Sequence, residues 1–305
     1  MNLGEELKQA WNRPNNGLIQ LIIINVVVFV LMVLLLVISK FSGADRIFEV
    51  VYNQFALPGS IEKFIYKPWT IITYAFTHSL SGILHILFNM LIFYWFGRVF
   101  VDYLGSQKLI NLYVLGAIAG GVTFMLFANL APISIISVGS TIVGASAAVY
   151  AIAVATATLV PDYTFYLLLI GPVRIKYLVA IAIFLSIMGS VGSNAGGAVS
   201  HLGGALIGWI YIKQLNSGNE MGKWVFYFMD WVKGIFKPKS KIKVSYKSDS
   251  FGKRKTKSST SKKKSNAKDK VSQDEIDAIL DKISEKGYES LSKEEKEKLF
   301  NASNK

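Results

Sequence analysis

Residues 17–39 read GLIQLIIINVVVFVLMVLLLVIS, a stretch of 23 residues that contains no charged side chain. A helix of about 20 apolar residues, rising ~1.5 Å per residue, crosses the ~30 Å hydrocarbon layer of a bilayer. No cleavage site with small residues follows a short apolar run, which favours an anchoring helix over a removed signal peptide. The stretch therefore predicts the first transmembrane helix of a membrane protein.

The composition of the chain extends this prediction. Of the 305 residues, 52% are hydrophobic and only 17% are charged, whereas soluble domains carry about 25% charged residues. We expect an all-α bundle of six transmembrane helices over residues 17–216, after a short polar cytoplasmic N-terminus at 1–16. Residues 40–82 are too polar to span the membrane and are expected to lie in its interface. The five further spans are predicted near 83–101, 109–130, 142–160, 175–190 and 199–216.

Positive charge is concentrated after the last predicted span. Residues 237–270 contain 14 Lys and Arg but only 2 Asp and Glu. Loops rich in Lys and Arg stay on the cytoplasmic side, so six spans place both termini in the cytoplasm and the chain in the cell (inner) membrane. We expect residues 217–270 to form a basic disordered linker that is drawn to anionic lipid headgroups. No nucleic-acid partner is expected.

Residue usage excludes several kinds of site. The chain has no cysteine and only 3 histidines, which rules out disulfides, a thiol nucleophile, and zinc or iron–sulfur sites ligated by cysteine. An HExxH zinc motif is also missing from the sequence. A zinc protease of that type is therefore excluded.

The C-terminal residues 271–305 predict a small cytoplasmic helical hairpin. Ser272 with Glu275, and Ser292 with Glu295, have the spacing of capping boxes that open two helices. Helices this short bury little core alone, so their apolar stripe is expected to dock on a partner protein, through residues 271–302, or on the membrane domain. A tail that only increases solubility is the alternative.

Four polar side chains lie at one level below the outer surface of the predicted bundle. A charged side chain at the centre of a membrane costs roughly 2.5–3.5 kcal/mol, so polar residues inside spans are candidates for function. Those four are His85 and Asn89 in the second span, Ser146 in the fourth and His201 in the sixth.

Each of the four has a chemical use. Ser146 near a helix N-terminus is a candidate nucleophile, because unsatisfied backbone N–H groups there would meet a developing oxyanion. His201 suits a general base. His85 and Asn89, one turn apart, can offer two donors from one helix face. Since no Asp or Glu lies at that depth, the prediction is a Ser/His dyad without an acidic third member.

Taken singly, each residue has a simpler explanation. A serine in an apolar helix usually packs and bonds a carbonyl one turn back, and a histidine near a helix end is usually interfacial. Gly204 and Gly208 form a GxxxG pattern, which we assign to helix packing. That packing would let the sixth span approach the Ala-rich fourth span closely enough for Ser146 to meet His201. The shared depth of all four side chains favours the functional interpretation.

The motifs around these residues resemble those of the rhomboid intramembrane serine proteases. The resemblance covers about residues 60–215, with the motifs in the expected order on the expected spans. The C-terminal hairpin resembles a short module at the end of some bacterial rhomboids. The matching motifs are HxxxN from His85 to Asn89, GxSG from Gly144 to Ala147 with Tyr150 one turn later, and HxxGxxxG from His201 to Gly208.

The resemblance implies a serine endopeptidase with a six-helix rhomboid core. Ser146 would be the nucleophile and His201 the general base, with Tyr150 packed against its ring. His85, Asn89 and the Ser146 backbone N–H would form the oxyanion hole. The fifth span would be a movable gate, and residues 191–198 would cap the site. Substrates would be single-span membrane proteins cleaved near the outer interface, and no cofactor is implied.

Three positions depart from the family pattern. Ala147 replaces the second glycine of GxSG and adds a methyl group beside the nucleophile. Trp69-Thr70 stands where the family often has Trp-Arg. His78 is two residues farther from His85 than expected, and its role is left open beside the alternative of an interfacial histidine.

Two other functions compete with the protease. An inactive rhomboid relative that binds membrane helices is the runner-up, but such relatives commonly lose the serine or the histidine. A small transporter would need internal repeats, broken helices or intramembrane carboxylates, and Asp102 and Asp162 lie in predicted loops.

Overall fold

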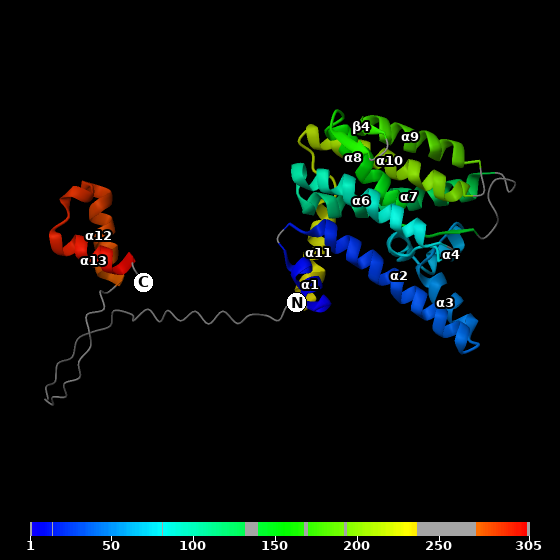
Figure 1. Cartoon of the computed structure of the whole chain (residues 1–305), viewed down its shortest axis with the longest axis horizontal. Coiled ribbons are helices and arrows are strands. Elements are labelled where there is room, and N and C mark those ends of the chain that lie inside the picture. The colour runs from blue at the N-terminus through cyan, green and yellow to red at the C-terminus, as the bar shows by residue number, and fades with distance from the viewer. Residues whose placement is uncertain are drawn as a thin grey trace. The chain divides into compact units, whose positions relative to one another are not determined.

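Long apolar runs become long helices in the computed structural model of the chain, which describes residues 2–13, 15–80, 82–131, 140–167, 170–191, 194–236 and 273–303. The chain forms two compact units, Met1–Lys239 and Ser240–Lys305, which are described separately (Figure 1). The helices of the first unit are α1 (Leu3–Asn12), α2 (Gly17–Phe41), α3 (Asp45–Phe55), α4 (Ile61–Ile65), α5 (Thr70–Thr73), η1 (Tyr74–Phe76), α6 (Ile83–Leu104), α7 (Ser106–Leu130), α8 (Ser146–Leu159), α9 (Ile175–Gly189), α10 (Ala195–Asn216) and α11 (Lys223–Phe236).

Four of these helices, α2, α6, α7 and α10, are long and apolar enough to cross a membrane. At ~1.5 Å per residue they extend about 33–38 Å. The helices α8 and α9 fall at the other two predicted spans but have only 14 and 15 residues, which gives about 21–23 Å. The all-α membrane bundle is thus confirmed, while the count of six spanning helices stays a prediction.

The short helix α8 forms the centre of the bundle. Nine of its 14 residues are buried, and most of its side chains are alanine, valine or threonine. Small residues let helices approach closely where lipid removes the hydrophobic driving force between them. On one side, a Cβ atom at Gly204 or Gly208 of α10 would collide with the carbonyl oxygens of Ala147 and Ala151.

On the other side of α8, the helix α7 packs through glycines as well. A Cβ atom at Gly116 would lie 2.6 Å from the Cβ of Ala151, and one at Gly120 would collide with the Cβ of Ala147. Backbone therefore lies against backbone or methyl group on both sides of α8. The predicted packing role of Gly204 and Gly208 agrees with this geometry.

The start of α8 differs from the predicted span 142–160. Thr141–Ile142 forms strand β2, which pairs antiparallel with β1 (Leu57–Pro58). Gly144 then adopts φ +134°, a conformation that ends regular structure and that L side chains rarely adopt. The helix begins only at Ser146, so the predicted start is wrong by four residues and Ser146 lies in the first turn.

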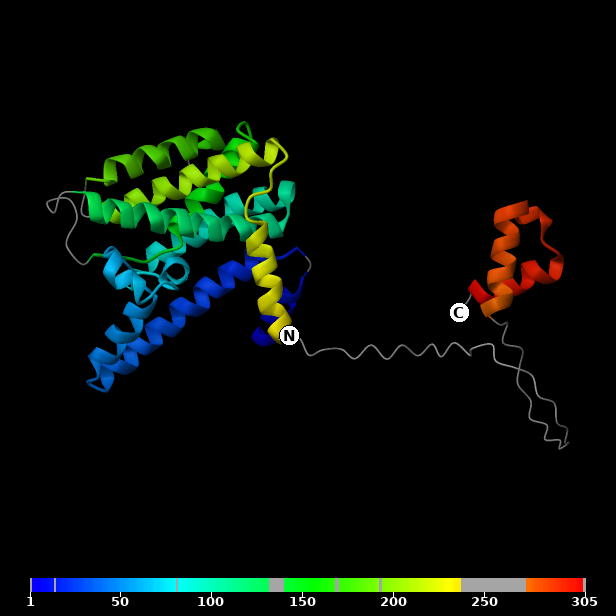
Figure 2. The same cartoon turned by 180° about the vertical axis from the view of Figure 1, so that it is seen from behind.

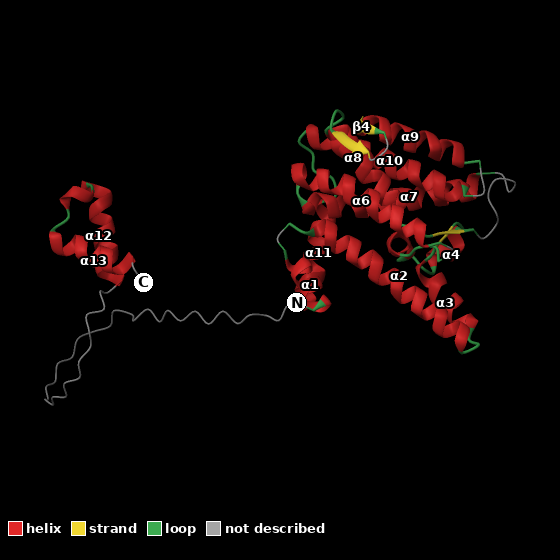
Figure 3. Ribbon diagram, viewed as in Figure 1, coloured by secondary structure: helices red, strands yellow, loops and turns green. Residues whose placement is uncertain are grey.

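Strands are few in the part of the chain that the structure describes (Figure 3). Besides β1 and β2, a hairpin joins β3 (Thr164–Leu167) and β4 (Gly171–Arg174) between α8 and α9. Lys176 Nζ lies 2.7 Å from Asp162 Oδ1 at the base of this hairpin. The hydrogen bond and charge of Lys176 lower the pKa of the Asp162 carboxyl, so this loop carboxylate is ionised at neutral pH.

A buried amide connects α2 to the bundle. Asn25 is fully buried, and its Nδ2 donates to the backbone oxygen of Leu21 and, over 3.1 Å, to Tyr113 Oη on α7. Tyr113 in turn donates to the Ala75 oxygen over 2.7 Å. Hydrogen bonds between helices replace hydrophobic attraction inside lipid. This polar contact was not predicted from the sequence.

The segment predicted for the interface, residues 40–82, consists of short helices that cannot cross a membrane alone. Trp69 Nε1 donates to the Gln54 oxygen over 2.8 Å, which ties the end of α3 to the start of α5. Thr70, found where the family often has arginine, is buried and donates to the Lys67 oxygen over 2.6 Å.

Helix α11 overturns part of the predicted linker. Disorder is expected from the sequence over residues 217–270, but residues 223–236 are helical. Its aromatic residues recur at helical spacing, with Trp224, Tyr227, Phe228 and Trp231 exposed along it. Val225 is buried. Figures 1 and 2 show α11 running crosswise to the long helices of the bundle. The basic run 237–270 lies outside the described residues.

The second unit contains the predicted pair of helices, α12 (Gln273–Lys286) and α13 (Lys293–Ser303), with η2 (Tyr288–Ser290) between them. The Ser292 capping box is confirmed: Glu295 N donates to Ser292 Oγ over 3.3 Å, and Ser292 N donates to Glu295 Oε2 over 2.7 Å. Lys282 reaches Glu295 at 2.9 Å and lowers the pKa of that carboxyl. Ser272 of the other predicted capping box lies outside the described residues.

Replacement of Gly208 by alanine tests the contact between α8 and α10. The added methyl group would collide with the Ala151 carbonyl oxygen, and overpacking of this kind lowers the free energy of unfolding by about 1–3 kcal/mol. Thermal melting of the purified protein in detergent measures the loss. Gly234→Ala is the matched control, because among the described residues nothing beyond its own helix backbone lies within 4 Å of the position that its added methyl group would take. Equal melting of the two variants would contradict the packing described above.

Candidate active site

Ser146 and His201 lie in direct contact. His201 Nε2 lies 2.8 Å from Ser146 Oγ, although the two residues are 55 positions apart in the chain. Ser146 is the first residue of α8, and His201 lies in the second turn of α10. The glycine contacts of α10 with α8 bring the two helices close enough for this bond.

The ring of Tyr150 holds the imidazole of His201 from one side. Tyr150 follows Ser146 by one helical turn, and its ring stacks on that of His201 with 4.4 Å between centroids and 9° between planes. The arrangement is the one that the family resemblance implies for these two residues.

The other ring nitrogen of His201 contacts a residue that the sequence analysis missed. Ser186 Oγ of α9 lies 3.1 Å from His201 Nδ1 and donates to Tyr150 Oη over 3.0 Å. A signal was present in the sequence, because Ser186 is the one polar side chain between residues 178 and 188. Polar residues inside membrane spans are costly and therefore candidates for function, and this rule identifies Ser186 in the fifth span as it does Ser146 in the fourth.

His85 faces Ser146 across Gly144. A Cβ atom built on Gly144 would lie 3.3 Å from His85 Nε2 and 3.7 Å from Ser146 Oγ. Because glycine has no Cβ atom, this position is a space between the His85 imidazole and the Ser146 hydroxyl. The same position lies 3.9 Å from the Ser146 backbone nitrogen. An oxygen atom in this space would face two potential donors.

Asn89 lies one turn farther along α6 and does not reach Ser146 directly. Its Nδ2 donates to the His85 backbone oxygen over 2.8 Å and lies 3.3 Å from His85 Nε2. Asn89 also lines an apolar cavity of about 250 Å³ between α6, α8 and α9. In this arrangement the amide contacts the His85 imidazole and borders the cavity.

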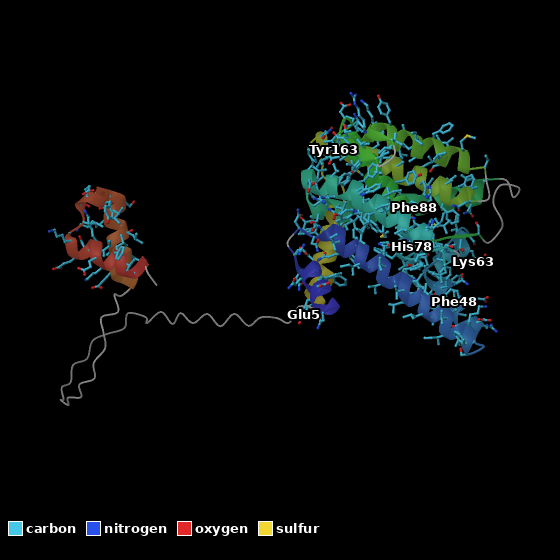
Figure 4. All side chains as sticks on the ribbon, viewed as in Figure 1. Glu5, Phe48, Lys63, His78, Phe88 and Tyr163 are labelled. Carbon is cyan, nitrogen blue, oxygen red and sulfur yellow. The ribbon has the colours of Figure 1, made fainter. Side chains whose placement is uncertain are left out.

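His78 packs behind the site, between α2 and α6 (Figure 4). It is 1% exposed, and its ring meets those of Phe29 and His85 edge-on, with centroids 6.5 Å and 6.1 Å away. Burial, followed by the charge of His85, lowers the pKa of His78 to about 4. The ring is therefore neutral at pH 7 and lies against His85 in the protein interior.

The methyl group of Ala147 does not crowd the nucleophile. It is buried against Gly120 of α7, where any side chain would collide with it. The departure from GxSG is thus accommodated on the face of α8 that meets α7. Gly144, Gly204 and Gly208 remain glycines at the points where a side chain would meet His85 or the backbone of α8.

A bundle of long apolar helices thus brings a serine hydroxyl and an imidazole into contact between α8 and α10. The Rhomboid domain family matches residues 66–216. RHOMBOID-like protein 12, mitochondrial, from Arabidopsis thaliana is 34% identical over 160 residues, which cover 49% of this chain and 47% of that protein. Residues 66–216 are therefore a domain of the rhomboid family, whose members generally are serine proteases acting on transmembrane substrates.

The comparisons also concern the C-terminal unit. Residues 260–305 match a family of unknown function, DUF6576. The matched part of the chain spans about half the length of the plant relative. The rhomboid resemblance of residues 60–215 is confirmed by the match of residues 66–216 to the Rhomboid domain family.

Gly144→Ala tests the space between His85 and Ser146. The substitution requires a methyl group at φ +134° and places it 3.3 Å from His85 Nε2. Loss of one oxyanion donor costs about 10²–10³ in rate, so labelling by a fluorophosphonate probe should slow by at least ~100-fold. Gly82→Ala is the control, since nothing lies within 4 Å of its methyl position. Unchanged labelling of a folded Gly144→Ala protein would rule out this space as the oxyanion site.

Proposed function

We propose that the protein is an intramembrane serine endopeptidase that cleaves transmembrane segments of other proteins near the outer interface. The 2.8 Å contact between Ser146 Oγ and His201 Nε2 is the observation that carries the proposal. A serine hydroxyl is a weak nucleophile until a neighbouring base accepts its proton. His201 is placed to be that base.

In the proposed reaction, Ser146 Oγ attacks the carbonyl carbon of the scissile bond while its proton passes to His201 Nε2. The oxyanion forms over Gly144, where His85 and the Ser146 backbone N–H donate to it. The positive end of α8 adds to this stabilisation, because Ser146 begins the helix. His201 then gives the proton to the departing amine. Water, activated by the same histidine, hydrolyses the acyl-enzyme and restores Ser146.

The substrate segment would enter beside the dyad through the apolar cavity of about 250 Å³. Trp95, Ala153 and Val179, from α6, α8 and α9, contribute to its walls, and Asn89 and Tyr150 lie on its border. An apolar lining suits the apolar side chains of a transmembrane segment. The proposed gate is α9, which forms one wall.

Charge supports the proposed sidedness of the reaction. Lys213 lies 12 residues beyond His201 on α10, which places it roughly 18 Å away along the helix axis. Lys108 and Lys223, which pair with Glu220 at 3.5 Å, mark the same end of the bundle. We place this end and both termini in the cytoplasm, with the dyad toward the outer face of the cell membrane.

The C-terminal residues have a separate proposed role. The basic run before the hairpin would contact anionic lipid headgroups, and residues 271–302 would bind a protein partner. Leu280 and Phe300 expose apolar side chains on this unit.

An inactive rhomboid relative that only binds membrane helices is the second candidate. Family membership alone fits it equally well. The retained Ser146–His201 contact favours the protease, because a binding protein has no use for a hydroxyl bonded to an imidazole.

Ser146→Ala and His201→Ala should each abolish cleavage of a model transmembrane substrate and labelling by a fluorophosphonate probe. His85→Ala should lose less than the ~10²–10³ expected of a single main donor, because the Ser146 backbone N–H shares the oxyanion with it. Asn89→Ala should lose less still, because Asn89 contacts the His85 imidazole and acts through it. Thr158→Val is the control, since Thr158 is a hydroxyl of the same helix that bonds only the Val154 oxygen. Full turnover by Ser146→Ala would end the protease assignment.

Ala153→Leu should separate substrate access from chemistry. The larger leucine side chain fills part of the cavity and leaves Ser146 and His201 unchanged. An apolar substrate segment would lose a contact worth ~1–3 kcal/mol. Cleavage of a transmembrane substrate should therefore fall about tenfold or more. Labelling by a small fluorophosphonate should stay within a few-fold. Leu206→Phe, at an exposed position of α10, controls for added volume. Parallel loss of both activities would show that the cavity is not a separate substrate site.

A further inference from the structure

A chain of hydrogen bonds leads away from the dyad to α9. His201 Nδ1 lies 3.1 Å from Ser186 Oγ, and Ser186 Oγ donates to Tyr150 Oη over 3.0 Å. Tyr150 Oη donates to the backbone oxygen of Ala182 over 3.1 Å. The chain thus ends on a main-chain carbonyl.

That carbonyl determines the direction of every bond in the chain. A carbonyl oxygen can only accept, so Tyr150 must donate its proton to Ala182. The Tyr150 oxygen then accepts from Ser186, whose single proton is used in that bond. The bond between Ser186 and His201 therefore needs its proton from Nδ1 of the imidazole.

A neutral imidazole carries one proton, so a proton on Nδ1 leaves Nε2 free to accept. Nε2 is the nitrogen that lies 2.8 Å from Ser146 Oγ. We propose that Ser186 is a positioning residue, which fixes His201 in the one tautomer that can deprotonate Ser146. The proposal rests on the protease function above and assigns a hydroxyl to the place that an acidic residue holds in a catalytic triad.

The same geometry links the dyad to the position of α9. Ser186 and Ala182 are four residues apart, so one turn of α9 supplies both groups that fix Tyr150 and His201. Only Ile175, Val179 and Ser186 of the 15 residues in α9 are buried, so most of this helix faces away from the bundle. Displacement of α9 would break the bonds at Ala182 and Ser186 together, and His201 could then adopt either tautomer. The dyad is then fully in its competent tautomer only while α9 is in place.

Water cannot replace Ser186 in this role. A cavity of about 330 Å³ borders Ser186 and His201, with Tyr150 and Asn194 in its lining. If the hydroxyl were removed, water in this cavity could bond Nδ1. A free water molecule donates as well as it accepts, so it imposes no direction on the chain.

The test compares Ser186→Thr with Ser186→Val in the full-length protein. The two side chains have nearly the same shape and differ in the hydroxyl, so steric effects cancel. Loss of one neutral hydrogen bond should make Ser186→Val about 3- to 10-fold slower than Ser186→Thr in kcat and in fluorophosphonate labelling, with KM unchanged. Ser190→Ala, which removes a hydroxyl bonded to the Ile187 oxygen at the end of α9, should match the wild type.

Nitrogen NMR of histidine-labelled protein supplies a readout that a merely structural residue would not change. With 3 histidines in the chain, the His201 signals can be assigned by substitution of the other two. Wild type and Ser186→Thr should show a protonated Nδ1 and an unprotonated Nε2, and Ser186→Val should show a mixture of tautomers. If the Ser186 variants fail to fold, Tyr150→Phe takes their place. This variant keeps the stacked ring but removes the bond to Ala182, and it should show the same mixture of tautomers.

The outcomes separate this proposal from the proposed function. A folded wild-type protein that neither labels nor cleaves would refute the protease function itself. An active wild type with equal rates and equal tautomer signals in Ser186→Thr and Ser186→Val would refute the role of Ser186. Unchanged signals in Tyr150→Phe would refute it as well.

Discussion

The contact of α8 with its two neighbours is the constraint on which the rest of the molecule depends. In lipid, helices gain no hydrophobic attraction for one another, so close van der Waals contact must hold them together. Here Gly204 and Gly208 allow α10 to lie on the carbonyl groups of α8, and Gly116 and Gly120 allow α7 to lie against the methyl groups of Ala151 and Ala147. The site follows from this packing, because a wider spacing of α8 and α10 would separate Ser146 from His201.

The helices and the pairing of Ser146 with His201 were predictable because they depend on patterns that the sequence carries locally. Uncharged runs mark the long helices, and small residues at fixed spacing mark the faces that meet. The capping box of Ser292 and Glu295 is local in the same sense. Family membership of the chain was likewise visible in the three motifs.

The features that were missed depend on tertiary context. The late start of α8 follows from the positive φ at Gly144 and from the pairing of β1 with β2, which join residues more than 80 positions apart. Asn25 and Ser186 were overlooked because a single amide or hydroxyl gains meaning only from its partner on another helix. Helix α11 was hidden within a range whose overall basic composition suggested disorder, although its own aromatic spacing was helical.

The packing of Ala147 against Gly120 has a consequence for how such chains vary. A methyl group at Gly120 would collide with the Cβ of Ala147 and would also lie 2.8 Å from Ser200 Oγ and 2.9 Å from the Ser200 backbone oxygen of α10. Exchange of Ala147 for glycine would therefore leave a side chain at position 120 still blocked by α10. Position 120 should tolerate only glycine, whereas the residue beside the nucleophile can be either glycine or alanine.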